Sequence, residues 1–208
     1  MDNYNDVLME QLADKGDGFY AYIDDLDEAE RLFESNLISS LQIIGKDVKV
    51  QVEFNPEVVE RYRLIGYENR AVADDDFRDD SVDGGEIGVG LAVTALYEVK
   101  LNPEAEGKIA TVDLRWLDPD TLHPSEILES IYTEELQHEF ESTDIYFQRD
   151  VLVAEFAEIL RESYWATPED LHLVCEHLER ISVYFEYDPE IRDLLTMVRS
   201  ALYLMHGE

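Results

Sequence analysis

Alternating apolar and polar residues, broken at intervals by turn sequences, constrain the fold of this chain more than any other feature. The alternation over residues 41–54 is typical of an antiparallel strand with one buried face, formed here by Val48, Val50, Val52 and Phe54. Further strands are expected over residues 59–67, 87–101 and 108–117, with Asn-Pro or Asp-Pro pairs among the turns. This spacing predicts a β-sandwich-like antiparallel domain over residues 41–122.

The segment before these strands has the pattern of a helix–strand–helix unit. Residues 4–14 place apolar side chains near helical spacing, and residues 18–23 (GFYAYI) are expected to form a short strand. Asp25 and Glu28 have the spacing of a capping box that begins a second helix. Residues 1–40 are therefore interpreted as a separate α/β piece.

The remaining segment is expected to be mainly helical. Residues 125–141 are ambiguous, because their apolar residues fit a helix face while the ILESIY stretch also fits an edge strand. Three amphipathic helices follow, with Pro168 in the first turn of the second one. Their expected buried residues are Val153, Phe156, Ala157 and Leu160; Leu171, Val174, Leu178 and Ile181; and Leu194, Leu195, Val198, Ala201, Leu202 and Met205. Residues 123–208 are predicted to form a C-terminal three-helix unit, which makes the fold class α+β.

The net charge narrows the choice of partners. The formal charge is −33, and the acidic residues are spread along the whole chain. Such a surface repels phosphates and anionic lipids, so cationic proteins, polyamines or divalent cations are expected rather than nucleic acid or membrane. The chain has 49 acidic residues but only five lysines. This composition predicts adaptation to high salt, because salt screens the repulsion between the acidic side chains. The sequence has no apolar run long enough for membrane insertion and no recognisable signal peptide, so a soluble chain is expected.

Seven carboxylates lie between Asp74 and Glu86 and form the strongest candidate site. An EF-hand beginning at Asp79 is excluded, because its twelfth position is Gly90, which supplies no carboxylate. A looser Ca²⁺ site stays open, with the candidate ligands Asp76, Asp79, Asp80, Asp83 and Glu86. The alternative is a solvated hairpin loop whose glycines set the turn.

Other candidate chemistry lacks the parts that it needs. Glu135 and His138 have the E-x-x-H spacing of a di-iron helix bundle, but the sequence contains no second such motif. His172, Cys175 and His177 fall on one predicted helix, yet no pattern indicates the orienting group and oxyanion hole of a thiol nucleophile. The sole cysteine also excludes an intrachain disulfide. The chain is therefore predicted to be non-enzymatic and to need no cofactor.

Two stretches, VKVQVEFNPEVVERYRLIGYENR and DGGEIGVGLAVTALYEV, carry the motif ENR…GEIG…VTALYE. In these stretches the chain resembles the domain of unknown function in YfbK-like bacterial proteins with a von Willebrand factor type A domain. Residues 2–33 resemble the closing helix–strand–helix of the type A domain, and VLVAEFAEILRES resembles the C-terminal region of the same family. One residue departs from the pattern, since Leu91 stands where the resemblance leads us to expect histidine.

The resemblance implies a C-terminal fragment that ends a type A domain and continues into an accessory domain. The Mg²⁺ motif D-x-S-x-S of type A domains is absent from the sequence, so their metal-dependent adhesion is not expected here. We expect a non-enzymatic accessory or protein-interaction module, with a cation-responsive module using residues 74–86 as the alternative. The apolar face of residues 1–40 is expected to be covered by the β-domain in a tight intramolecular dock, or by another protein chain, including a second copy in a homodimer. Full-length relatives are expected at the cell envelope, while the location of this chain stays open.

Overall fold

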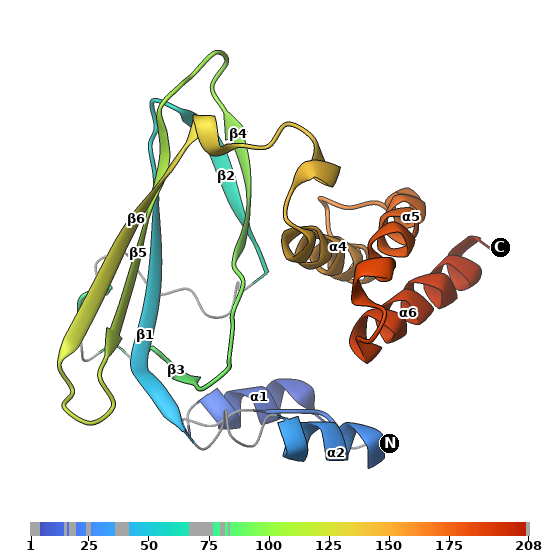
Figure 1. Ribbon diagram of the computed structural model, residues 1–208, viewed down its shortest axis with the longest axis horizontal. Helices are drawn as coiled ribbons and strands as arrows, with labels where there is room; N and C mark the ends of the chain where they lie inside the picture. Colours follow the sequence, from blue (N-terminus) through green and yellow to red (C-terminus); the bar gives the residue numbers. More distant parts are fainter. Residues whose placement is uncertain are drawn as a thin grey trace. The chain divides into compact units, whose positions relative to one another are not determined.

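The computed structural model describes residues 5–14, 16, 20–23, 26–35, 42–66, 77–79, 82 and 84–206. The chain is an α+β protein with two antiparallel sheets followed by three C-terminal α-helices (Figure 1). It divides into two compact units. The first contains Met1–Glu60, Asn69–Val93 and Leu101–Thr133, and the second contains Arg61–Glu68, Thr94–Lys100 and Glu134–Glu208. The domain boundaries expected from the sequence, at residues 40/41 and 122/123, stay a prediction.

The first unit contains a four-stranded antiparallel sheet in the order β3–β1–β5–β6. Its strands are β1 (Ile43–Phe54), β3 (Gly85–Gly88), β5 (Lys108–Leu117) and β6 (Pro124–Tyr132). The same unit includes helices α1 (Asp6–Asp14) and α2 (Leu26–Ser35). The bounds of β1 and β5 confirm two of the strands expected from alternation. The ambiguous ILESIY stretch is part of β6, so the edge-strand interpretation is correct and the helical one is wrong.

The N-terminal helix–strand–helix prediction holds only for its helices. Residues 20–23 form no strand, which corrects the expectation for the described part of GFYAYI. The physical reason is that a strand needs a hydrogen-bonded neighbour, and no described strand pairs with these residues. Asp25, the first residue of the expected capping box, lies outside the described residues.

The single strand expected over residues 87–101 is also wrong, because a turn after β3 interrupts it. Leu91 N–H donates to the Gly88 carbonyl at 3.2 Å, and Gly90 lies at φ 78°. Glycine adopts this left-handed conformation without the steric cost of a Cβ. The chain re-enters a strand at β4 (Leu96–Leu101), which pairs with β2 (Val59–Ile65) in a separate two-stranded sheet.

The second unit combines most of β2 and β4 with helices α4 (Ile145–Leu160), α5 (Leu171–Ser182) and α6 (Pro189–His206). Helix α5 contacts both α4 and α6 (Figure 1). Short 3₁₀ turns connect the elements at Thr133–Glu135, Phe140–Ser142, Pro168–Asp170 and Val183–Phe185. The predicted α5 stripe of Leu171, Val174, Leu178 and Ile181 is fully confirmed as part of the core. In α6, Leu194 and Val198 are buried as predicted, whereas Met205 is exposed.

Helix α4 is rotated relative to its predicted stripe. Phe156 is buried as expected, but Val153 and Leu160 are exposed, while Leu152 and Ile159 face the core. The apolar residues of α4 lie nearly all round the helix, so their period does not fix its buried face. Its core-facing side also buries two polar residues, Gln148 and Glu158, which find hydrogen-bond partners there.

Candidate functional site

The four-stranded sheet has one polar and one apolar face. Residues directly opposite each other in antiparallel strands point to the same side, so the pairing register assigns the faces. The polar sheet face consists of Lys49, Gln51, Asp113, Arg115, Glu126 and Leu128. The valine face includes Val50, Val52, Val112, Leu114 and Ile127, with Glu129 also on this side at the β6 edge. Apolar side chains are usually buried and charged ones exposed, but these two faces show the reverse: Lys49 on the polar sheet face is only 3% exposed, whereas Val50 on the valine face is 57% exposed. The prediction that Val50 belongs to a buried face is therefore wrong.

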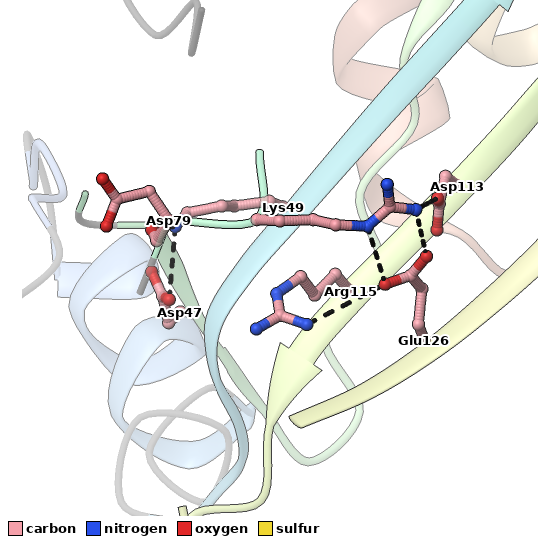
Figure 2. A network of polar contacts seen from close by, with 7 residues as sticks. Asp47, Lys49, Asp79, Asp113, Arg115 and Glu126 are labelled. Atoms are coloured by element: carbon pink, nitrogen blue, oxygen red, sulfur yellow. Dashed lines mark hydrogen bonds and ion pairs between the residues drawn. The ribbon is translucent and has the colours of Figure 1, made fainter. Parts of the chain in front are cut away.

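A bulge in β1 allows the polar sheet face to bury a lysine. The pairing of β1 shifts between Lys46 and Lys49, and Asp47 in this bulge adopts φ 51°. Figure 2 shows the Lys49 side chain reaching towards Asp47 and Asp79. Its amine donates to the Asp79 carbonyl at 2.7 Å and to Asp47 Oδ2 at 3.3 Å. Lys49 therefore connects the bulge to the acidic loop, and its ion pair offsets part of the desolvation of a buried ammonium.

Arg78 makes the second connection between the acidic loop and the sheet. Its Nη2 lies 2.6 Å from Glu126 Oε1 on β6 and 3.2 Å from Asp113 Oδ2 on β5. Arg115 lies beside the same Glu126, at 3.8 Å (Figure 2). The neighbouring Phe77 is buried, so an apolar side chain and a guanidinium both hold this end of the loop.

The Asp113 and Glu126 carboxyls titrate differently. Burial raises the pKa of Asp113, and Glu126 raises it further, while Arg78 and Arg115 oppose this. The hydrogen bond from Arg78 lowers the pKa of Glu126. The surroundings therefore shift the two pKa values in opposite directions. Carboxyls with separated pKa values are used in acid–base catalysis. Here the carboxyl oxygens of Asp113 and Glu126 bind Arg78 and so hold the acidic loop against the sheet. This contact indicates a structural role for both carboxyls.

The structure describes only two of the five candidate Ca²⁺ ligands. Asp79 uses its backbone carbonyl to accept from Lys49, and Glu86 lies on β3, half-buried. Asp76, Asp80 and Asp83 lie outside the described residues, so the Ca²⁺ site stays a prediction. Among the described residues, no three His, Cys, Asp or Glu side chains come together in a group that could hold a metal ion.

Gly84 explains how the acidic loop meets the bulge. A Cβ atom on Gly84 would lie 2.7 Å from the Asp47 carbonyl carbon and 2.9 Å from the Val48 oxygen. The two backbone segments therefore approach so closely that only glycine fits between them without displacement. The sequence indicated a glycine turn here but gave no sign of this contact with β1.

In the second unit, a separate ion-pair network fixes α4 to the two-stranded sheet. Arg63 on β2 donates to Glu158 on α4 at 2.8 Å and to Glu98 on β4 at 2.9 Å. The Glu158 carboxylate is 5% exposed and also accepts from Ser163. Burial alone would raise the pKa of Glu158, but hydrogen bonds from Ser163 and Arg63 hold it below the ordinary value. All of these charges have partners, so the network stabilises the unit.

The structure also describes the surroundings of the other sequence candidates. Glu135 ends a 3₁₀ turn and His138 lies beyond it, so the two do not share the helix that a di-iron site requires. Burial raises the pKa of the Cys175 thiol, and the Glu179 charge raises it further, which disfavours the reactive thiolate. His177 packs edge-on against Phe140 at 5.4 Å.

Sequence reasoning missed both Lys49 and Arg78. A signal was available, because lysine is scarce in this chain and Lys49 occupies a polar position in the middle of a strand. Arg78 is the one basic residue within the acidic run, but nothing in the sequence indicates its partners on β5 and β6. Together these residues hold the loop that was considered as a cation site.

The first unit is therefore an antiparallel sheet with one polar and one apolar face, and ion pairs within the chain engage the charged residues of the polar sheet face. Residues 39–107 match the family model described as "Uncharacterized protein YfbK, C-terminal". The chain is also 44% identical over 118 residues to "Uncharacterized protein YfbK" of Escherichia coli (strain K12). Residues 39–107 thus match the YfbK C-terminal domain, which confirms this part of the resemblance.

The match covers 57% of this chain and 20% of the Escherichia coli protein, so the chain spans about a fifth of its curated relative. No solved structure matches the chain. The type A remnant expected over residues 1–40 stays a prediction. In the described ranges, the helices are too short or too polar to cross a membrane.

Proposed function

We propose that this chain is a non-enzymatic accessory module that binds a protein partner within a bacterial protein of the von Willebrand factor type A class. The observation that carries the proposal is the exposure of the valine face, where Val50 is 57% and Ile127 is 49% exposed. Apolar side chains gathered on one open face of a sheet are characteristic of interaction surfaces.

The charged residues support a binding role rather than a reaction. Lys49, Arg78 and Arg63 are each engaged with carboxylate or carbonyl oxygens of the chain itself. Their contacts hold strands, the acidic loop and a helix in place, so they are explained without a substrate. In the proposal, a partner covers the valine face as the second layer of a sandwich-like arrangement would. That partner is another protein or a second copy of the chain.

Site-specific photo-crosslinking tests the proposal. A photoreactive amino acid replaces Val50 on the valine face or, as the matched control, Glu53 on the adjacent exposed position of the polar face. Both full-length variants are made in the source bacterium and irradiated. We expect a discrete crosslinked species from position 50 but not from position 53, and its mass distinguishes a homodimer from another protein. Crosslinking that is absent at position 50, or equal at both positions, overturns the proposal.

A further inference from the structure

Strand β6 leaves one long edge of the four-stranded sheet open. It is the outermost strand, and in the described part of the chain it pairs only with β5. Every residue of β6 except Ser130 is exposed. The opposite edge strand, β3, has only four residues, whereas β6 has nine. Short edge strands are a common protection against unwanted pairing, and β6 lacks it.

An open edge can accept an additional extended strand through its backbone. Its outward N–H and C=O groups form a ladder with a peptide, while neighbouring side chains select which peptide binds. Ile127 belongs to the valine face, and the register places Ile131 on the same side. These residues are 49% and 41% exposed. Apolar side chains at alternate positions of an added strand would therefore extend the valine face.

The charge at this edge selects the other residues of the added strand. Glu126 and Glu129 point to opposite sheet faces, so acidic groups flank the edge on both sides. Within the first unit, residues 116–133 contain four Asp or Glu and no Lys or Arg. Such a region attracts basic side chains and repels acidic ones.

The same charge disfavours a second copy at this edge. Each copy carries a formal charge of −33, and joining two β6 strands would bring two acidic segments together. Self-pairing is therefore opposed by repulsion both over the whole molecule and at the edge. The same negative field that repels a second copy of the chain attracts a cationic partner.

We propose that β6 is a docking edge for an extended segment of another protein in which basic and apolar residues alternate. The segment adds as a fifth strand next to β6. Its apolar side chains align with Ile127 and Ile131 on the valine face, and its basic side chains lie on the polar sheet face, on the same side as Glu126. Glu129 lies between the two isoleucines on the valine face and adds to the negative field along the edge. This inference rests on the proposed function and identifies the class of partner.

Fluorescence anisotropy with a labelled Lys-Val-Lys-Val-Lys-Val-Lys peptide tests the docking edge. Two control peptides separate strand addition from charge attraction: one has the same composition in blocks, and the other carries N-methyl groups on alternate residues. Amide hydrogen exchange on the full chain locates the binding. We expect the alternating peptide to bind at least about tenfold more tightly than either control and to protect amides within Pro124–Tyr132.

Two charge-matched variants complete the test. Glu129→Lys changes the edge, while Glu176→Lys makes the same change in net charge at an exposed position of α5. We expect Glu129→Lys to weaken binding about tenfold and Glu176→Lys to have a much smaller effect.

Three outcomes overturn the docking edge: equal binding of the control peptides, equal weakening by both variants, or a dimer whose β6 amides are protected without peptide. The last outcome would identify a second copy as the occupant. Failure here is distinguishable from failure of the proposed function, because crosslinking from Val50 on the valine face needs no strand addition at β6.

Discussion

Removing the Lys49 ammonium should destabilise the first unit strongly. The Lys49 side chain is 1% exposed, and its partner Asp47 is 13% exposed, so Lys49→Met leaves a largely buried carboxylate without its cation. Breaking a buried ion pair from one side costs about 3–5 kcal/mol. The loss of the Asp79 contact acts in the same direction, because the acidic loop then loses one of its connections to the sheet.

A second substitution isolates the charge effect. Asn at position 47 keeps an oxygen acceptor and tolerates the left-handed backbone at φ 51°. In Asp47→Asn/Lys49→Met the buried group is neutral, and leaving a neutral polar group without a partner costs about 1–3 kcal/mol. The double variant should therefore recover about 2 kcal/mol relative to Lys49→Met, from the difference between these two costs.

Tryptophan fluorescence during urea unfolding measures the stability of the first unit, which contains Lys49. The chain has two tryptophans, and Trp165→Phe leaves Trp116 on β5 as the only reporter, close to Gly45 in the bulged region of β1. All variants are compared in this background at about 1 M NaCl, which screens the net charge. If the double variant is no more stable than Lys49→Met, the ion pair does not hold the bulge and the reasoning is refuted.

Three further predictions follow from single contacts. Gly84→Ala should lower the free energy of unfolding by about 1–3 kcal/mol, because its Cβ meets the backbone of Asp47 and Val48. In the same urea titrations the control Gly85→Ala, which has open space around it, should stay within about 0.5 kcal/mol of the parent. Similar losses at both positions would contradict the close approach of Gly84 to β1. Glu158→Gln should lower the free energy of unfolding by about 1.5–3 kcal/mol at neutral pH. The lowered pKa of Glu158 means that its carboxylate contributes stability above the unfolded pKa of about 4.3, and this contribution is lost as the pH falls through the folded pKa. A stability difference between variant and parent that stays constant down to about pH 3 would argue against this linkage. If residues 74–86 bind Ca²⁺, millimolar Ca²⁺ should raise the thermal midpoint beyond Mg²⁺ and NaCl of matched ionic strength, and equal effects of the three salts would indicate screening of the −33 charge instead.

Much of the secondary structure could be predicted because its signals are local. The period-two pattern locates β1 and β5, and the α5 stripe lies at helical spacing within one twelve-residue helix. Where the local signal is ambiguous, the prediction failed or stayed open. The apolar residues of α4 do not define a single face, and the pattern over residues 87–101 gives no sign that β3 and β4 join different sheets.

The candidate site depended more heavily on distant contacts. The sequence located the acidic run and its glycines, but not the cations that hold it. Lys49 meets the Asp79 carbonyl from 30 residues away, and Arg78 reaches Asp113 across 35 residues. Such pairings depend on strand order and register, which no short sequence pattern specifies.

The sequence by itself therefore determined the fold class, the family resemblance and the acidic surface, because these follow from local periodicity and composition. The tertiary structure decided which sheet face is covered, which helix side is buried and which strand forms the open edge. The physical reason is that burial is a property of neighbours. Lys49 is buried because the bulge and the acidic loop supply oxygens for its ammonium, whereas Val50 on the other face of the same strand stays exposed.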